Sequence, residues 1–250
     1  MTGPPSPFSA AYSLPVRTPI LDLCRPWFHA FCRFFFGLEL RGVDRIPLTG
    51  AVIIAPNHQT YADPPLVTIP VHRPVFYMAW DRLFRIPLLG WFIRRLRAFP
   101  VDVEARDSRA TREVVRLLRA GEAVMIFPEG ERSLDGQLAA FKMGAFRLAA
   151  SLEIPVLPVT ITGGHEVWPP HRLLPRRGRM TITYHPLVRP EPELGSREAA
   201  RRLADRTRAA ILSAMPAGGA TSTDPPGSRE RWETRLRPRF PSTQTRSSTR

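Results

Sequence analysis

Short apolar runs and longer amphipathic segments alternate along most of this chain. The apolar runs have the length of strands buried in a sheet; they cover residues 51–55, 74–79, 98–101, 123–127, 155–160 and 180–184. The segments between them carry apolar residues at helical spacing, which predicts helices over residues 65–71, 83–96, 108–120, 141–152 and 196–215. Strands that alternate with helices predict an α/β domain with a central mixed, largely parallel sheet wrapped by helices.

Several residues mark where these helices begin and end. Ser196 can serve as the N-cap of the last helix, and Gly121 has the position of a C-cap after the helix over residues 108–120. Pro87 interrupts the segment over residues 83–96, so we expect one or two helices there.

The segment over residues 19–41 is dense in aromatic residues, and charged residues and Pro26 interrupt it. These interruptions make it a poor transmembrane span. Aromatic residues beside Arg25 and Arg33 are typical of an amphipathic helix in the headgroup region of a membrane. An ordinary helix docked on the core has the same pattern. The two interpretations are compatible, because different faces of one helix can serve the two roles.

The two ends of the chain differ from its middle in composition. Residues 1–18 are rich in Pro, Ser and Thr, and residues 216–250 are rich in Ser, Thr, Pro and Arg. Such segments bury too little apolar surface to fold, so we expect two disordered tails, the C-terminal one basic. Residues 42–215 then form the folded domain, preceded by the helix over residues 19–41.

A histidine and an aspartate follow the first apolar run, in the stretch from Asn57 to Pro64. A turn between His58 and Asp63 would bring the carboxylate onto the imidazole, which would fix the tautomer and leave the other ring nitrogen basic. The spacing alone is weak, because Asp63 before Pro64 also resembles a helix N-cap and His58 could be a structural histidine at a strand end.

A second polar block follows a later strand, and it strengthens the first. It reads Phe127-Pro128-Glu129-Gly130-Glu131-Arg132-Ser133, where Gly130 permits a tight turn and Arg132 offers a planar fork for phosphate. By itself this block could be a polar turn with an internal Glu–Arg pair. With His58, Asp63 and the later run 154–159, however, it occurs in an order that resembles the glycerolipid acyltransferase family, which includes the lysophosphatidate (1-acyl-glycerol-3-phosphate) acyltransferases.

This resemblance extends from about residue 42 to residue 188 and implies an acyl transfer reaction. It implies that His58, oriented by Asp63, deprotonates a lipid hydroxyl that attacks an acyl thioester, without a metal or other cofactor. The donor would be an acyl-coenzyme A or an acyl-carrier-protein thioester. The resemblance also implies an acceptor site that contains Asn57, Glu129, Gly130, Arg132 and Ser133.

One stretch departs from the family pattern. Family members usually have Gly-x-x-Phe-Ile-Asp-Arg, whereas this chain has Arg97 in place of the glycine and Val103 in place of the arginine that contributes to the phosphate site. Glu131 stands where the family usually has threonine, and it adds negative charge. We therefore expect a weaker preference for a bare phosphomonoester, unless another arginine such as Arg94, Arg97 or Arg106 supplies the charge.

Composition restricts the possible partners. The formal net charge is +14, and Lys142 is the only lysine, so arginine dominates the positive charge. A positive surface attracts anionic lipid, nucleic acid or a phosphorylated cofactor, and charge alone does not choose among them. A nucleic-acid-binding protein is the rival class, but the arginines form no known reading motif. A serine hydrolase lacks support because the chain has no Gly-x-Ser-x-Gly elbow.

The two cysteines, Cys24 and Cys32, show no metal-ligand pattern and are expected to pack in a helix. Without a disulfide framework or a secretory signal, we expect a location at the cytoplasmic face of a membrane, with peripheral or monotopic attachment. The expected partners are a lysophospholipid acceptor, the thioester donor, with acyl carrier protein as one of its two alternative carriers, and an anionic membrane surface, but no nucleic acid.

Overall fold

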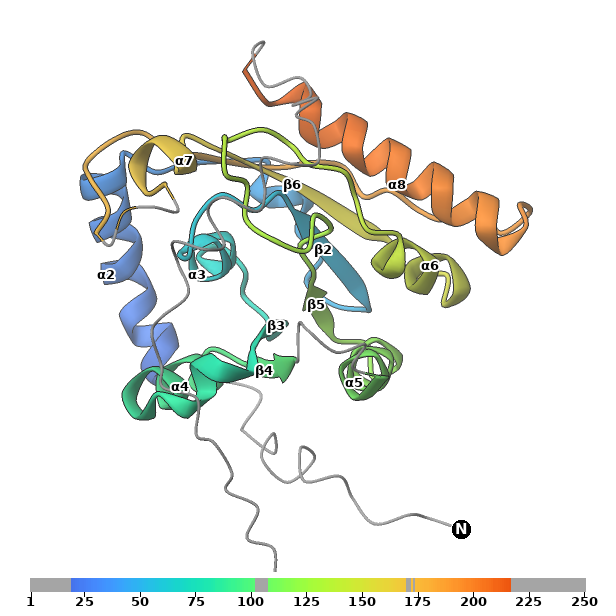
Figure 1. Cartoon of the computed structure of the whole chain (residues 1–250), viewed down its shortest axis with the longest axis horizontal. Coiled ribbons are helices and arrows are strands. Elements are labelled where there is room, and N and C mark those ends of the chain that lie inside the picture. The colour runs from blue at the N-terminus through green and yellow to red at the C-terminus, as the bar shows by residue number, and fades with distance from the viewer. Residues whose placement is uncertain (1–18, 102–107, 170–171, 173, 217–250) are drawn as a thin grey trace, which may run out of the picture.

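Strands form the centre of the domain in a computed structural model that describes residues 19–101, 108–169, 172 and 174–216. They are β1 (Glu39–Arg41), β2 (Val52–Pro56), β3 (Val75–Trp80), β4 (Ala98–Val101), β5 (Ala123–Met125), β6 (Val156–Thr162) and β7 (Thr181–Tyr184). They make one seven-stranded sheet in the order β1-β7-β6-β2-β5-β3-β4. The neighbours from β6 to β4 are parallel, while β7 runs antiparallel to β6 and β1 parallel to β7. The predicted mixed, largely parallel sheet is confirmed (Figure 1).

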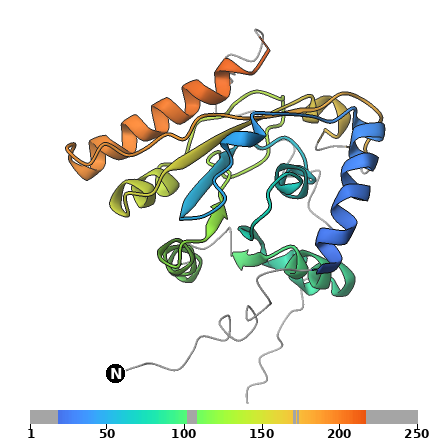
Figure 2. The ribbon, with the colours of Figure 1, turned by 180° about the vertical axis from the view of Figure 1, so that it is seen from behind.

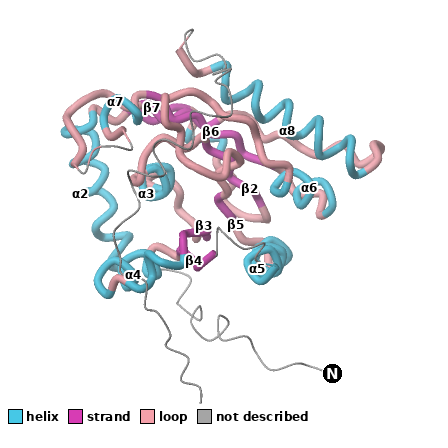
Figure 3. Tube along the Cα trace, in the orientation of Figure 1, coloured by secondary structure: helices cyan, strands magenta, loops and turns pink. Residues whose placement is uncertain are grey.

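Helices cover both faces of this sheet (Figures 1 and 2). They are α2 (Pro19–Phe36), η1 (Val43–Arg45), α3 (Asp63–Thr68), η2 (Asp81–Arg85), α4 (Pro87–Arg95), α5 (Ser108–Arg119), α6 (Gly144–Ser151), α7 (Gly164–Val167) and α8 (Ser196–Ser213). Figure 3 shows α5, α6 and α8 on one side of the strands and α2, α3 and α4 on the other. The fold is therefore a three-layer α/β arrangement.

Two clusters of buried residues explain why the layers hold together. Successive residues of a strand point to opposite faces of the sheet. Ile53 accordingly packs with α5, α6 and α8, whereas Ile54 packs with α2, α3 and η2. Because both faces are covered, β2 is buried at every position. This double coverage is the reason that its sequence is a continuous apolar run rather than an alternating one.

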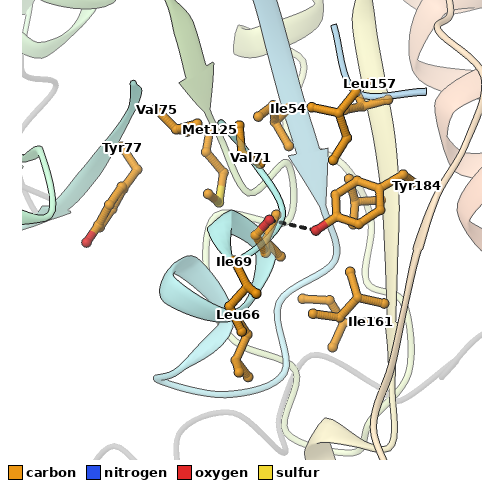
Figure 4. Close-up of a cluster of buried hydrophobic side chains, with 14 of the residues drawn as sticks. Ile54, Leu66, Ile69, Val71, Val75, Tyr77, Met125, Leu157, Ile161 and Tyr184 are labelled. Atoms are coloured by element: carbon orange, nitrogen blue, oxygen red, sulfur yellow. Dashed lines mark hydrogen bonds between the residues drawn. The ribbon is translucent and has the colours of Figure 1, made fainter. Parts of the chain in front are cut away.

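A hydrogen bond inside the first cluster fixes the position of α3. The buried Tyr184 hydroxyl of β7 donates to the Val67 carbonyl of α3 at 2.6 Å (Figure 4). Leu66 and Ile69 pack beside it against Ile54 and Ile161. The helix that begins with Asp63 is thus held against the sheet by both apolar and polar contacts.

Most elements were predicted within a few residues, and the differences have local causes. The break near Pro87 is confirmed, since η2 and α4 are separate. Gly121 follows α5 with a φ of 79°, as expected of a C-cap. Ser196 is wrong as the N-cap, because Gly195 occupies that position and makes no side-chain cap bond. The sequence did not predict β1 or α7, which are only three and four residues long. The two predicted disordered tails lie outside the described residues.

Two glycines in the connection from β1 to β2 provide a test of this packing. Gly42 and Gly50 both have positive φ, but a Cβ on Gly42 would lie 2.3 Å from the Tyr184 carbonyl oxygen, whereas a Cβ on Gly50 would meet nothing within 4 Å. We expect Gly50→Ala to lower the free energy of unfolding by about 1–2 kcal/mol, the cost of the left-handed backbone alone. Gly42→Ala should cost about 1–3 kcal/mol more because β7 must move. Urea unfolding of the two variants measures the difference; equal losses would contradict the described contact.

Candidate active site

The predicted catalytic residues lie beyond the carboxyl ends of the central strands. His58 follows β2 by two residues, and the block from Phe127 to Ser133 follows β5, the neighbour of β2. Parallel strands bring such loops to the same edge of a sheet, which is where α/β proteins usually bind their ligands. The two motifs, more than sixty residues apart in the sequence, therefore meet.

The Asp63 carboxylate organises the turn between β2 and α3. It is completely buried, and it accepts hydrogen bonds from the Gln59 backbone N–H at 2.6 Å, from the Thr60 backbone N–H at 2.8 Å and from the Thr60 hydroxyl at 2.6 Å. Ala62, not Asp63, has the N-cap position of α3. The alternative that Asp63 is only an N-cap is therefore wrong, because its carboxylate faces back into the turn.

The same carboxylate orients the His58 ring. His58 Nδ1 lies 2.8 Å from Asp63 Oδ2. A carboxylate can only accept, so Nδ1 carries a proton and the lone pair of the neutral ring resides on Nε2. Nε2 has no hydrogen-bonding partner among the described residues. The Phe127 ring stacks on the imidazole at 3.9 Å between centroids and 22° between planes, which fixes the ring plane. The predicted approach of Asp63 to His58 is thus observed.

The block after β5 holds the His58 backbone from both sides. Glu129 Oε1 accepts from the His58 N–H at 2.8 Å, and the His58 carbonyl accepts from the Ser133 N–H at 2.7 Å. Glu129 Oε2 accepts from the Ala139 N–H at 2.8 Å. Glu129 therefore joins the two motifs to each other and to the loop before α6.

Burial raises the pKa of Glu129 to about 7. Loss of hydration is the largest cause, and the negative charge of Asp63 acts in the same direction. The two backbone N–H donors and the positive charge of Arg208 on α8 oppose this shift. The carboxyl of Glu129 consequently changes its charge near neutral pH.

Arg132 lies against the turn that contains His58. Its guanidinium stacks on the Tyr61 ring at 3.6 Å from the centroid, and Tyr61 contacts the Trp168 ring edge-on at 6.2 Å. Arg132 Nη1 is buried without a hydrogen-bonding partner among the described residues. A stacked guanidinium keeps the N–H groups at its edge free to bind an anion. Arg132 therefore has the geometry expected of an anion-binding residue.

The other predicted substrate-binding residues make internal contacts. The Asn57 amide donates to the Ile161 carbonyl at 3.0 Å and accepts from the Ile161 N–H at 2.7 Å, which fastens the end of β2 to β6. The Ser133 hydroxyl donates to Asp135 at 3.0 Å. Gly130 has a φ of 77°, and the Lys142 side chain lies across its Cα, where a Cβ would collide with it. The assignment of all of these residues, and of Glu129, to the acceptor site stays a prediction.

The arginines proposed to replace the missing phosphate ligand are not brought to this site in the described part of the chain. In the sheet register, Ala98 aligns with Tyr77 of β3, and Tyr77 with Met125 of β5. Arg97 is therefore level with the middle of the central strands, on the amino-terminal side of His58, and it stacks on Phe76. Arg94 stacks on Phe84. Val103 and Arg106 lie outside the described residues.

Sequence reasoning did not assign roles to three residues that complete the site: Thr60, Tyr61 and Phe127. Thr60 binds the Asp63 carboxylate, Tyr61 supports Arg132, and Phe127 supports His58. Each belongs to one of the two motifs, so its position was visible. The partners of Tyr61 and Phe127 were not visible, because each stacking contact joins segments that are distant in the sequence, and the bond of Thr60 to Asp63 depends on the shape of the turn.

The described residues contain neither a candidate metal site nor a candidate membrane span. No group of three or more His, Cys, Asp or Glu side chains there could hold a metal ion. No described helix is sufficiently long and apolar to cross a membrane. The expectation that the reaction uses no cofactor stays a prediction.

Comparison with known proteins relates this geometry to a family. The family model described as Acyltransferase matches residues 37–162. A 1-acyl-sn-glycerol-3-phosphate acyltransferase of Chlamydomonas reinhardtii is 30% identical over 80% of this chain. An enzyme of the same name from Pseudomonas aeruginosa is 27% identical over 74% of this chain and 74% of its own length. The chain spans 60% of the algal relative's length, and 51% and 38% of the lengths of chloroplastic relatives from Brassica napus and Arabidopsis thaliana.

A solved structure has the same fold. It is the crystal structure of the 1-acyl-sn-glycerophosphate (LPA) acyltransferase PlsC from Thermotoga maritima, with a TM-score of 0.64 and 25% sequence identity. The match covers 83% of this chain and 87% of that chain. The similarity therefore includes most of the sheet as well as the two motifs.

The buried Glu129 predicts a dependence of stability on pH. Its pKa is higher in the folded protein than its ordinary value of 4.5, so the folded state retains the proton up to about pH 7. The contribution of Glu129 to the free energy of unfolding should be largest below pH 4.5 and fall by about 3 kcal/mol as the pH rises to about 7, with only a small further loss above that pH. Glu129→Gln should remove this fall because an amide does not titrate, although the variant loses one of the two oxygen acceptors. Urea unfolding between pH 4.5 and 8 measures how the free energy of unfolding depends on pH in wild type and in Glu129→Gln. The exposed Glu193→Gln variant is the control. An unchanged slope in Glu129→Gln would contradict the assignment.

Proposed function

This chain belongs to the glycerolipid acyltransferase family, and from that premise we propose that it transfers a fatty acyl group from an acyl thioester to the hydroxyl of 1-acyl-glycerol-3-phosphate, in phospholipid synthesis. The resemblance inferred from the sequence is confirmed by the family model that covers residues 37–162. The names of the similar proteins from Chlamydomonas reinhardtii, Pseudomonas aeruginosa and Thermotoga maritima support this acceptor.

One observation carries the proposed reaction: His58 Nδ1 is bound to the buried Asp63 carboxylate at 2.8 Å, so that Nε2 is the basic atom of the ring. Nε2 takes the proton of the acceptor hydroxyl while the oxygen attacks the thioester carbonyl carbon. The resulting tetrahedral intermediate expels the thiolate, and the new ester bond replaces the carbon–sulfur bond. The imidazolium then returns the proton to the thiolate, which leaves as a thiol. Asp63 stabilises the imidazolium between these two steps.

The protein needs no acyl-enzyme intermediate in this scheme. The two cysteines, Cys24 and Cys32, both belong to α2 and not to the turn that holds His58. Ser133 directs its hydroxyl to Asp135 rather than to a base. The attacking oxygen therefore belongs to the substrate.

Recognition of the phosphate is assigned to Arg132. Its guanidinium is held by Tyr61 and has a buried nitrogen without a protein partner among the described residues. Glu131, the next residue, is exposed and carries a negative charge that opposes phosphate binding. A different lipid acceptor, with a phosphodiester or an uncharged headgroup, is therefore the alternative within the family.

The donor and the location also belong to this proposal. The donor is acyl-coenzyme A or an acyl carrier protein thioester, and assays with both distinguish them. Attachment is peripheral, at the cytoplasmic face of a membrane, through α2. Supporting this, α2 buries Cys32 and Phe36 against the sheet and leaves Trp27, Phe31 and Phe34 exposed. Such a face is typical of interfacial helices.

The reaction scheme predicts the effect of changes at the two catalytic residues. His58→Ala and Asp63→Ala should each lower kcat for acyl transfer by about 10²–10⁴-fold, because each removes the oriented base. Asp63→Asn should be intermediate, since one amide oxygen can still accept from Gln59, Thr60 and His58, but the charge that stabilises the imidazolium is lost. Release of free thiol with lysophosphatidate and an acyl thioester measures the rate. The exposed His72→Ala variant is the matched control. Near wild-type turnover by folded His58→Ala would overturn the mechanism.

The role of Arg132 predicts a change in acceptor selectivity. Arg132→Gln should lower kcat/KM for lysophosphatidate by about 10- to 150-fold, equivalent to about 1.5–3 kcal/mol for a charge-assisted contact. The rate with an uncharged monoacylglycerol should change little. The exposed Arg147→Gln variant on α6 controls for loss of positive charge. An equal loss with both acceptors would mean that Arg132 supports the fold of the site and does not select phosphate. A wild type that favours other acceptors over lysophosphatidate would support the alternative.

A further inference from the structure

The elements η2 and α4 expose large apolar side chains, whereas a helix docked on a core usually buries them. Gly90 is the only residue of α4 that is fully buried. The large apolar side chains instead point outward: Leu88 is 85% exposed and Trp91 58%, and Ile86 and Phe92 are exposed as well. Helices on the surface of soluble domains usually bury their large apolar residues and expose polar ones.

The inward glycine is required by the packing of α4 on η2. A Cβ on Gly90 would lie 2.5 Å from the Phe84 carbonyl oxygen. The side of α4 that carries Gly90 therefore lies close to η2, while the Phe84 side chain is buried in the core. This arrangement fixes the direction in which Leu88 and Trp91 point, so their exposure is a consequence of the fold and not of a loose helix.

Arginines accompany these apolar residues. Arg82 lies 4.8 Å from the Trp80 ring centroid, and Arg95 lies 4.8 Å from that of Trp91. Residues 80–96 contain four arginines and one acidic residue, Asp81. Aromatic rings covered by guanidinium groups have an apolar body and a cationic tip, as side chains at membrane–water interfaces do.

The helix α4 lies close to α2, which carries exposed aromatic residues of its own. Both helices cover the same side of the sheet, and α4 lies beside the amino-terminal end of α2 in both views (Figures 1 and 2). Trp27, at the middle of α2, is 78% exposed. The two elements are separated by about fifty residues in the sequence, and the fold makes them neighbours.

We propose that η2 and α4 form a second membrane-docking surface, which inserts Leu88, Trp91 and Phe92 into the headgroup region of an anionic bilayer. The guanidinium groups of Arg82 and Arg95, which lie over the Trp80 and Trp91 rings, contact lipid phosphates at the same depth. The occupant is a lipid surface and not a second copy of this chain, because a symmetric contact would bring four arginines against the same four arginines. The proposal rests on the proposed function only in that a lipid acceptor resides in a membrane.

Vesicle binding of the full chain tests this surface without requiring turnover. The double variant Leu88→Ser/Trp91→Ser should bind vesicles of phosphatidylcholine and phosphatidylglycerol at least about tenfold more weakly than wild type, because two apolar side chains no longer enter the interface. Leu48→Ser, which removes a leucine that is 74% exposed outside this surface, is the matched control and should bind as wild type does. High salt and pure phosphatidylcholine should both weaken wild-type binding.

A conservative variant keeps the test valid if the double variant does not fold. Trp91→Phe retains an apolar ring, so it should bind as wild type does, but it should lose part of the tryptophan quenching that brominated acyl chains cause. Equal vesicle binding by the double variant and wild type would overturn the proposal, as would unchanged quenching in Trp91→Phe. A wild-type dimer that the double variant abolishes, with vesicle binding unchanged, would assign the surface to self-association instead.

Acyl transfer to a lysolipid in detergent micelles should be the same in wild type and the double variant. If wild type transfers to no acceptor while vesicle binding behaves as described, the proposed function fails and this surface stands.

Discussion

The buried Asp63 carboxylate is the interaction on which the site depends. A charge without solvent is costly unless hydrogen bonds replace its hydration. Here the backbone of Gln59, the backbone and hydroxyl of Thr60, and the His58 ring supply those bonds. The shape of the turn and the direction of the catalytic ring are therefore consequences of the same requirement. A turn of different shape would leave the carboxylate with fewer donors.

Contacts with the rest of the sheet hold this turn in place. Tyr184 and the apolar residues around it fix α3, on which Asp63 resides, and Asn57 fastens the end of β2 to β6. Glu129 and Ser133 bind the His58 backbone from the loop after β5. The loops after β2 and β5, together with residues of β6 and β7, thus determine the position of one imidazole. Glu129 accordingly makes its contacts within the protein, whereas Arg132 has a buried nitrogen without a hydrogen-bonding partner among the described residues.

The two faces of the sheet have different surroundings. The helices α5, α6 and α8 cover one face and bury their apolar residues in it. The helices α2, α3 and α4 cover the other, and α2 and α4 also carry large exposed aromatic and aliphatic residues. The exposed apolar residues of helices are thus concentrated on one side of the molecule. This asymmetry agrees with the proposed lipid acceptor, because such a substrate resides in an apolar phase.

The sequence by itself predicted six of the seven strands and most helices, and with the family resemblance it also predicted the pairing of His58 with Asp63. These follow from local patterns: six apolar runs, helical spacing, and a turn of five residues whose carboxylate can reach only its own neighbourhood. It also indicated the family, because three motifs occur in a fixed order. It did not predict β1 or α7, since three or four residues carry too little periodic signal.

Only the tertiary structure decided what the motif residues contact. Phe127 supports His58, Tyr61 supports Arg132, and Glu129 binds the His58 backbone, and each contact joins loops whose approach depends on strand order. Likewise, the sequence predicted one or two helices over residues 83–96, but not what would surround their apolar residues. Their exposure was decided by Gly90, which packs against Phe84 and turns Leu88 and Trp91 outward. Hydrophobic spacing predicts that a helix has an apolar face, but the neighbours of that face are fixed only when the whole chain is folded.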